Sequence, residues 1–238
     1  MTATHPPRHV CWYLKGFPLF SHLPKVALRR LEARLKPQHV GAGAILYPPA
    51  RIPGSVFLLR KGSVEIARLG PRGRKVGLAV VGPGEAFGYL GLLEGKEWPH
   101  VATALEACEL WRVPAREFRR LCRHHPEVTL EVARTLSGKA IVFSAKIESL
   151  IFKAIPSRLA ETLAALAERF GVRGDSGWCI DLPLSQQSLA DMIGASRQHV
   201  NSALTHLAGR DLIRRPKGRA GRFDIPDKAA LLAAAGQR

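Results

Sequence analysis

The segment at residues 184–215 contains the side chains with the clearest chemistry in this chain. Arg197, Gln198, Asn201 and Ser202 fall on the outer face of a predicted helix, near its start. Arg can pair with guanine through two hydrogen bonds, and Gln or Asn can pair with adenine. These residue types at this spacing predict contacts to base edges in the major groove of DNA.

Two predicted helices and a tight turn position these side chains. Ser185 caps the first helix, Gly194 permits the turn, and Ser196 caps the second helix. Apolar residues recur at helical spacing in both helices, namely Leu189, Met192 and Ile193, then Val200, Ala203, Leu204 and Leu207. This order is typical of a helix-turn-helix.

A basic segment follows the second helix. Residues 217–222 read KGRAGR and precede the triplet Phe-Asp-Ile at 223–225. This pattern predicts a β-hairpin wing in which Lys217 and Arg219 contact DNA phosphates. A flexible basic tail is the alternative.

The charge of the whole chain favours a polyanionic partner. The chain has 36 Lys and Arg against 19 Asp and Glu, a formal net charge of +17, which promotes salt-sensitive association with nucleic acid. A charge that only maintains solubility is the alternative. Arginines outside the second helix contribute to it: Arg29, Arg30, Arg34, Arg116, Arg119, Arg120 and Arg123.

The first part of the chain has the pattern of a β-rich domain. Residues 1–16 are predicted to be a loosely ordered lead-in, and a short helical segment follows at 23–35. Between Val40 and Val113, brief apolar runs alternate with Gly and Pro, which predicts an antiparallel β-barrel or roll. We expect residues 17–125 to form one domain.

A long helix is predicted at 126–154. Its apolar residues are spaced by alternating steps of three and four, as in a coiled coil: Leu136, Ala140, Phe143, Ile147 and Leu150. We expect this stripe to pair two subunits, because a dimer places two reading helices on one face of a two-fold operator. A helix packed only against its own β-domain is the alternative.

Ile155 and Pro156 form the predicted hinge, since proline removes a backbone donor and restricts the residue before it. Residues 155–238 then form the predicted DNA-binding domain. An apolar stripe packs beneath the helix-turn-helix in this domain, and its residues are Leu159, Leu163, Leu166 and Phe170.

The cysteines and the hydropathy pattern argue against other classes of protein. Cys11, Cys108, Cys122 and Cys179 show no CxxC and no metal-ligand spacing, so we expect reduced thiols and no metal. No signal segment and no run of about 18 apolar residues occurs. The expectation is a cytoplasmic protein with no membrane partner.

The order of these parts resembles the CRP/FNR family of bacterial transcription regulators, whose namesakes are the cyclic-AMP receptor protein and the fumarate-nitrate reduction regulator. The similarity covers nearly the whole chain after Phe17, and its most specific parts are residues 84–93 (GEAFGYLGLL), 118–121 (FRRL) and 196–200 (SRQHV). It implies an α+β fold with an N-terminal cyclic-nucleotide-binding-like antiparallel β-roll, a long dimerisation helix and a C-terminal winged helix-turn-helix.

The resemblance also locates an effector pocket, where this chain departs from the members that bind cyclic AMP. Their ribose-binding Glu follows the glycine matched by Gly88, and here that place holds Tyr89. Their Arg-Ser pair for the cyclic phosphate is matched by Trp98 and Pro99, and their adenine-binding Thr-Ser pair by Phe143 and Ser144. Because a phosphate taken out of water needs a cation or several N–H donors, we expect that cyclic AMP is not the ligand. Lys96 is a nearby residue that offers a positive charge.

No cofactor is expected. Iron–sulfur members of the family need a close N-terminal cysteine cluster, whereas this chain has Cys11 alone near that end. Haem-binding members use a His or Cys of the roll, and His9, His22, His100 and Cys108 are formal candidates. A lone His or Cys is far more often an ordinary surface or core residue.

In the second helix, the resemblance assigns guanine reading to Arg197. The Glu that follows it in cyclic-AMP-type members is replaced by Gln198, and their second Arg falls at Ser202, so we expect a related but altered operator. Ser185, Gln186 and Ser196 are interpreted as phosphate contacts, and both serines also cap their helices.

These features predict a sequence-specific transcription regulator, a homodimer on double-stranded DNA that contacts RNA polymerase as an activator. We expect no enzymatic activity, because no catalytic grouping has a recognisable context. A regulator competent without a ligand is favoured over one gated by a cyclic nucleotide, haem or another small molecule in the β-roll, because the phosphate-binding set is lost and Trp98 and Phe143 can close the cavity. An architectural protein that binds DNA without sequence preference is the third alternative.

Overall fold

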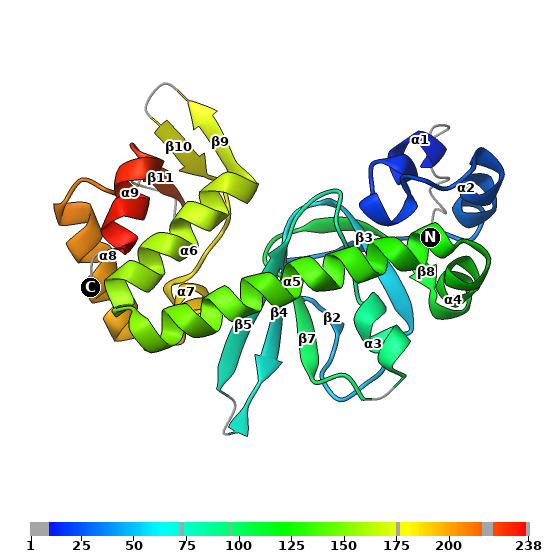
Figure 1. Cartoon of the computed structure of the whole chain (residues 1–238), viewed down its shortest axis with the longest axis horizontal. Coiled ribbons are helices and arrows are strands. Elements are labelled where there is room, and N and C mark those ends of the chain that lie inside the picture. Colours follow the sequence, from blue (N-terminus) through cyan, green and yellow to red (C-terminus); the bar gives the residue numbers. More distant parts are fainter. Residues whose placement is uncertain (1–9, 72–73, 96, 175–176, 216–220, 237–238) are drawn as a thin grey trace. The chain divides into compact units, whose positions relative to one another are not determined.

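The computed structural model describes residues 10–71, 74–95, 97–174, 177–215 and 221–236. Figure 1 traces these elements along the chain. The chain divides into two compact units, one built from the described residues of 1–66 and 80–140 and the other from those of 67–79 and 141–238. Within the described residues, no helix is both long and apolar enough to cross a membrane.

Short helices begin the first unit. They are α1 (Val10–Lys15), the 3-10 helix η1 (Pro18–Phe20) and α2 (Lys25–Glu32). Val10 and Leu14 of α1 are buried beside Phe17 in an apolar core. The prediction of a loosely ordered lead-in is therefore wrong for residues 10–16, because apolar residues one helical turn apart have a core to enter. Residues 1–9 lie outside the described part.

Two four-stranded sheets form the predicted β-roll, which is confirmed. The first sheet has the order β1-β8-β3-β6 and the second the order β2-β7-β4-β5. The strands are β1 (Lys36–Val40), β2 (Ile45–Tyr47), β3 (Ser55–Lys61), β4 (Val64–Leu69), β5 (Lys75–Val81), β6 (Ala86–Phe87), β7 (His100–Ala104) and β8 (Cys108–Pro114). Antiparallel pairing sets Phe57 of β3 opposite both Arg112 of β8 and Phe87 of β6. Cross-strand partners face the same side of a sheet.

Two further helices flank the roll in the first unit. The sequence did not predict α3 (Tyr89–Glu94), which follows Gly88 in a left-handed conformation with φ of 85°, a conformation that favours glycine. The next helix, α4 (Ala115–His124), buries Phe118 and Leu121. Phe118 joins the core formed with α1, η1 and α2, whereas Phe57 and Phe87 belong to a separate core inside the roll.

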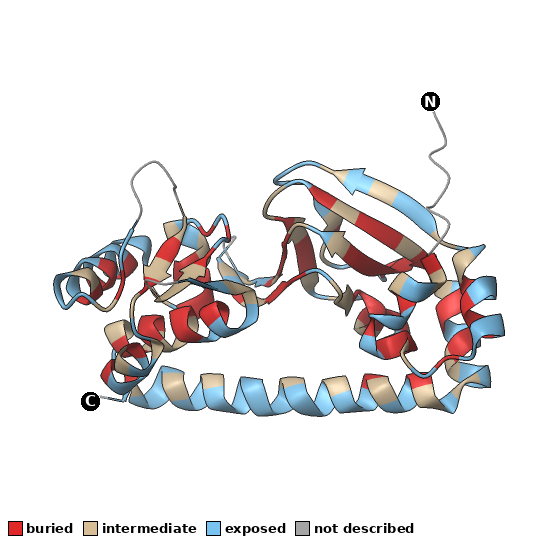
Figure 2. Ribbon diagram, turned by 90° about the horizontal axis from the view of Figure 1, so that it is seen from above, coloured by how far each residue is buried: buried red, intermediate tan, exposed pale blue. Residues whose placement is uncertain are grey.

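The predicted long helix is α5 (Pro126–Phe152), which ends two residues before the predicted boundary at 154. Val128 and Val132, in its first turns, are its buried residues. Most of its remaining surface is exposed in the single chain (Figure 2).

The second unit is organised around α6 (Ile155–Phe170). Ala154 is its N-cap and Pro156 lies in its first turn, as predicted. Leu159, Leu163 and Leu166 are buried, whereas Phe170 is half-buried. The other elements are β9 (Gly171–Gly174), β10 (Gly177–Ile180), α7 (Gln186–Ile193), α8 (Arg197–Gly209), β11 (Phe223–Ile225) and α9 (Lys228–Ala235). The strands form a sheet of order β11-β10-β9, and α6 packs against α7, α8 and α9.

Candidate functional site

The helices α7 and α8 form the predicted helix-turn-helix. Ser185 Oγ accepts a hydrogen bond from the backbone N–H of Ser188 at 2.9 Å, and Ser196 Oγ accepts one from the N–H of His199 at 3.2 Å. Each serine therefore satisfies one of the unpaired donors at the start of its helix. Gly194 has φ of 64° in the turn, where a Cβ would be strained. The prediction of two capped helices joined by a glycine turn is confirmed.

The faces of α8 separate as the residue spacing predicts. Four apolar residues are each at most 3% exposed: Val200, Ala203, Leu204 and Leu207. The four candidate base contacts are all exposed: Arg197, Gln198, Asn201 and Ser202. Burial of the inner face fixes α8 on the core of the unit, so that its first two turns present their polar side chains to solvent.

Gln186 joins two of these candidates into a hydrogen-bonded group. Its Nε2 donates to Oδ1 of Asn201 at 3.1 Å, and its Oε1 accepts from Nε of Arg197 at 3.4 Å. Gln186 is the first residue of α7, so one amide connects the starts of both helices. The sequence predicted only a phosphate contact for Gln186. Its place directly after the N-cap Ser185 is the signal that it lies at the start of α7.

The predicted wing lies only partly within the described residues. β11 pairs antiparallel with β10, and backbone hydrogen bonds of 2.8 and 2.9 Å join Arg214 to Asp224. Lys217 and Arg219, the predicted phosphate contacts, lie outside the described part of the chain.

Two arginines beside the wing have acidic partners. Arg214 donates to both carboxylate oxygens of Asp211 at 3.0 Å, and this hydrogen bonding lowers the pKa of the Asp211 carboxyl. Arg222 forms an ion pair with Asp181. The exposed Arg197 has a neutral partner instead, the Gln186 amide, so its charge is not neutralised by that contact.

Aromatic side chains fill the interior of the roll. The rings of Phe57 and Phe87 stack with centroids 5.1 Å apart, and the Tyr47 ring lies 6.0 and 6.3 Å from them. Trp98 packs against this core, and its indole N–H donates to the Tyr47 hydroxyl. Burial raises the pKa of Tyr47, so this hydroxyl stays neutral. Pro99 is exposed.

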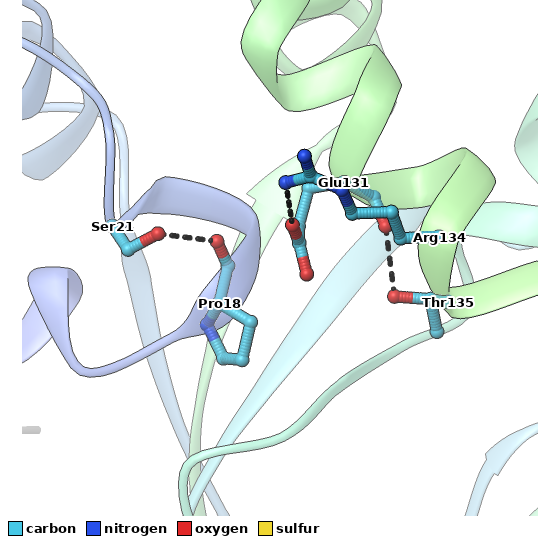
Figure 3. A network of polar contacts seen from close by, with 5 residues as sticks. All are labelled: Pro18, Ser21, Glu131, Arg134 and Thr135. Atoms are coloured by element: carbon cyan, nitrogen blue, oxygen red, sulfur yellow. Dashed lines mark hydrogen bonds and ion pairs between the residues drawn. The ribbon is translucent and has the colours of Figure 1, made fainter. Parts of the chain in front are cut away.

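Tyr89 occupies the position that the resemblance assigns to a ribose-binding carboxylate. It is 2% exposed, its hydroxyl is hydrogen-bonded to the Thr135 side chain, and Lys139 Nζ lies 5.6 Å from its ring centroid. Thr135 Oγ1 donates to the carbonyl of Glu131 at 2.9 Å, as Figure 3 shows, so the Tyr89 hydroxyl is the donor to Thr135. The turn at Gly88 and the phenol of Tyr89 thereby connect α3 to the first half of α5. The sequence contains no local signal for this contact.

The predicted dimerisation residues form an exposed apolar stripe on α5. Leu136, Phe143, Ile147 and Leu150 are 43%, 39%, 59% and 43% exposed, and Ala140 is exposed between them. Phe143 belongs to neither buried core of the first unit, and Ser144 beside it is also exposed. The exposed apolar residues of α5 are not confined to this stripe, because Ile141, Val142, Ile151 and Phe152 are also exposed.

The cysteines are thiols without disulfide partners. Cys11 Sγ donates to Oε2 of Glu32 at 2.7 Å, and burial together with this carboxylate raises the pKa of Cys11 to about 11. Burial also raises the pKa of Cys108 and Cys122. Such thiols are poor nucleophiles and metal ligands near neutral pH. Among the described residues, no three His, Cys, Asp or Glu side chains group as a metal site would require.

Comparison with known proteins finds both domains in the same order. Residues 37–125 match the cyclic nucleotide-binding domain, and residues 157–234 match the Crp-like helix-turn-helix domain. A CRP-like cAMP-activated global transcriptional regulator of Mycobacterium tuberculosis is 27% identical over 196 residues, covering 82% of this chain and 88% of that protein. The global nitrogen regulator of Synechocystis is 30% identical over 190 residues, covering 78% and 84%.

The fold is also found among solved structures. FixK2 from Bradyrhizobium japonicum matches with a TM-score of 0.75 at 19% identity, covering 86% of this chain and 98% of that one. Since the domain order, the capped helix-turn-helix and the identity over most of the chain agree, this protein belongs to the CRP/FNR family of DNA-binding transcription regulators.

Proposed function

We propose that this protein reads a two-fold DNA operator as a homodimer and does so without a small-molecule effector. In this proposal residues 17–125 are a sensor-like domain, residues 126–154 the dimerisation helix and residues 155–238 the DNA-binding domain. The observation that carries the proposal is the hydrogen-bonded group of Gln186, Arg197 and Asn201 at the exposed start of α8.

The chemistry of this group supports readout of bases. Guanidinium and amide groups in fixed positions can each form two hydrogen bonds with one base edge. We assign base contacts to Arg197, Gln198, Asn201 and Ser202. We assign phosphate contacts to Ser185, Gln186, Ser196, Lys217 and Arg219, and Gln186 has the second role of holding Arg197 and Asn201.

The exposed stripe of α5 supports the dimer. Apolar surface of this extent on one helix is covered in most soluble proteins, and the spacing of Leu136, Ala140, Phe143, Ile147 and Leu150 fits a helical seam. Two copies of α5 paired along this stripe bring two reading helices to one duplex.

The aromatic interior of the roll supports effector independence. Tyr47, Phe57, Phe87 and Trp98 fill the space with rings and offer no cation to a cyclic phosphate. Tyr89 connects α3 to α5 through Thr135, and this connection needs no bound ligand. We infer that these contacts hold the roll in one state.

One observation favours the ligand-gated alternative. Arg112 faces the roll interior, with its guanidinium carbon 5.8 Å from the Phe57 ring centroid. Its NH2 group donates to Ser55 at 3.3 Å, but its buried Nε has no partner among the described residues. An anionic ligand would satisfy this donor, and the Mycobacterium relative is described as cAMP-activated.

Selection of bound DNA from a random pool, with and without cyclic AMP, tests the proposal. We expect a two-fold symmetric motif without any ligand, unchanged by the nucleotide. The Arg197→Ala variant should lose preference at one base pair of each half-site, whereas Arg34→Ala removes the same charge from the first unit and should retain the motif. Enrichment only with cyclic AMP would establish gating by that nucleotide, and no enrichment in either condition would favour gating by another small molecule or an architectural role.

The remaining parts of the proposal follow from the family. Two relatives are named a global transcriptional regulator and a global nitrogen regulator, which supports contact with RNA polymerase as an activator, a cytoplasmic location and no catalytic activity. A reporter gene placed downstream of the selected motif tests activation, because a repressor would lower its expression.

A further inference from the structure

Two arginine-containing segments that are distant in the sequence meet in the first unit. Helices α2 and α4 line a hollow of about 360 Å³. Its lining residues are Pro24, Val26, Ala27, Arg30, Leu31, Glu117, Arg120, Leu121, His124 and His125. The DNA-binding function involves none of these residues.

The hollow has an apolar floor and a cationic rim. Ala27, Leu31 and Leu121 are each at most 7% exposed and supply the floor. Arg30 and Arg120 project from different helices at the rim and are exposed. Such a combination suits a ligand with an apolar body and an anionic head.

The single acidic residue in this lining is already neutralised. Oε2 of Glu117 lies 2.8 Å from NH2 of Arg120, and its Oε1 lies 3.6 Å from Nε of Arg116. Arg30, in contrast, has no acidic partner among the described residues. The lining therefore retains one uncompensated guanidinium, which can bind a carboxylate or phosphate through two hydrogen bonds.

We propose that this hollow binds a small amphipathic organic anion, an apolar chain or ring that carries one carboxylate or phosphate. Arg30 holds the anionic head, and the apolar body lies on Ala27, Leu31 and Leu121. Its volume lies within the range of small-molecule sites, about 300–1,000 Å³.

The position of the hollow connects it to the long helix. His125 follows the last residue of α4, its N–H donates to the carbonyl of Leu121 at 2.8 Å, and its Nδ1 lies 3.2 Å from Oε1 of Glu127 in the first turn of α5. An anion that reaches His125 competes with Glu127 for this imidazole. Binding of an anion in the hollow would thereby change the contact between His125 and Glu127 at the start of α5. This effect does not involve the interior of the roll.

Isothermal titration of the full-length protein without DNA tests the site, and its outcome does not depend on the proposed regulator function. The probes are octanoate, octyl phosphate and the uncharged octanol. We expect an anionic probe to bind at one saturable site per chain. Whichever of octanoate and octyl phosphate binds more tightly identifies the preferred head group as carboxylate or phosphate. Arg30→Ala should weaken this binding about 10-fold or more, whereas Arg34→Ala, an exposed arginine outside the lining, should change it less than about twofold.

Three outcomes would overturn the inference. The first is that neither anion binds saturably up to about 1 mM, a very weak affinity for a specific site. The second is that octanol binds as tightly as the anions, since the cationic rim would then contribute nothing. The third is an equal loss in Arg30→Ala and Arg34→Ala, which would show general charge attraction. Both substituted arginines are exposed, and thermal unfolding of each variant verifies that the fold is retained.

Discussion

Gln186 illustrates how one neutral side chain can control two others. It holds Asn201 at 3.1 Å and Arg197 at 3.4 Å before any DNA is bound. A side chain that is already oriented loses less conformational entropy when it pairs with a base. Arg197 and Asn201 are thus partly prepared for readout by a residue on the other helix.

We predict that Gln186→Ala relaxes base preference at two positions of each half-site, by roughly 1 kcal/mol at each. The measurement is the affinity for operators that carry single base-pair changes. Gln187→Ala is the matched control, because Gln187 donates to Asp191 within α7 at 2.8 Å and should affect stability without changing the pattern of preference. An unchanged pattern in Gln186→Ala would contradict the positioning role.

The first half of helix α5 is bonded to helix α3 through the side chain of Tyr89. The Tyr89 hydroxyl is buried and bonded to Thr135. We predict that Tyr89→Phe lowers the free energy of unfolding by about 0.5–1.5 kcal/mol, measured with urea. Thr135→Val removes the same hydrogen bond, so the double variant should lose less than the sum of the two single losses. Additive losses would argue against the bond.

The same residue gives α5 a pH-dependent attachment. Burial raises the pKa of Tyr89 above its ordinary value near 10, so the unfolded chain releases this proton first as pH rises. The stabilisation by Tyr89 is therefore complete below about pH 10 and declines as pH approaches the folded pKa. The stability difference between wild type and Tyr89→Phe should be constant from neutral pH to about pH 9 and should shrink above pH 10. A difference that grows with pH would contradict this sign.

Substitutions in the second half of α5 test whether the protein is a dimer. Ile147 is 59% exposed within the predicted stripe, whereas Val142 is 63% exposed but lies about 140° around the helix from Ile147. We predict that Ile147→Glu produces monomers in sedimentation equilibrium and that Val142→Glu remains dimeric, because only the first places a charge in an apolar seam. Dissociation by both variants, or by neither, would refute the proposed seam.

The charge of the whole molecule determines how its DNA affinity responds to salt. A formal charge of +17 predicts steep loss of affinity as salt rises, because each neutralised phosphate releases counterions. Lys217→Ala should weaken binding to all DNA sequences alike. It should also reduce by about 1 the slope of the logarithm of the binding constant against the logarithm of the salt concentration. Arg197→Ala should cost about 1–3 kcal/mol on the selected site and much less on random DNA. Equal loss on both DNAs for the two variants would leave no evidence of sequence reading.

Much of the architecture was predictable because it depends on interactions between residues that are close together in the sequence. The serine caps at Ser185 and Ser196, the turn at Gly194 and the apolar spacing of α8 are interactions within about one helical turn, so their residue types are visible in the sequence. Helix α1 was missed because a helix of six residues depends on burial of Val10 and Leu14 in a core that the local sequence does not reveal.

The sequence by itself determined the order of the domains, the helix-turn-helix, the face of α8 that meets solvent and the basic character of the chain. The tertiary structure alone decided which distant side chains come together: Gln186 bonds to Arg197, Tyr89 bonds to Thr135, and Arg30 and Arg120 line one hollow. Local periodicity and capping act along the chain, and packing of the elements fixes the rest, because a side chain's partners across a fold depend on how whole elements bury their apolar faces.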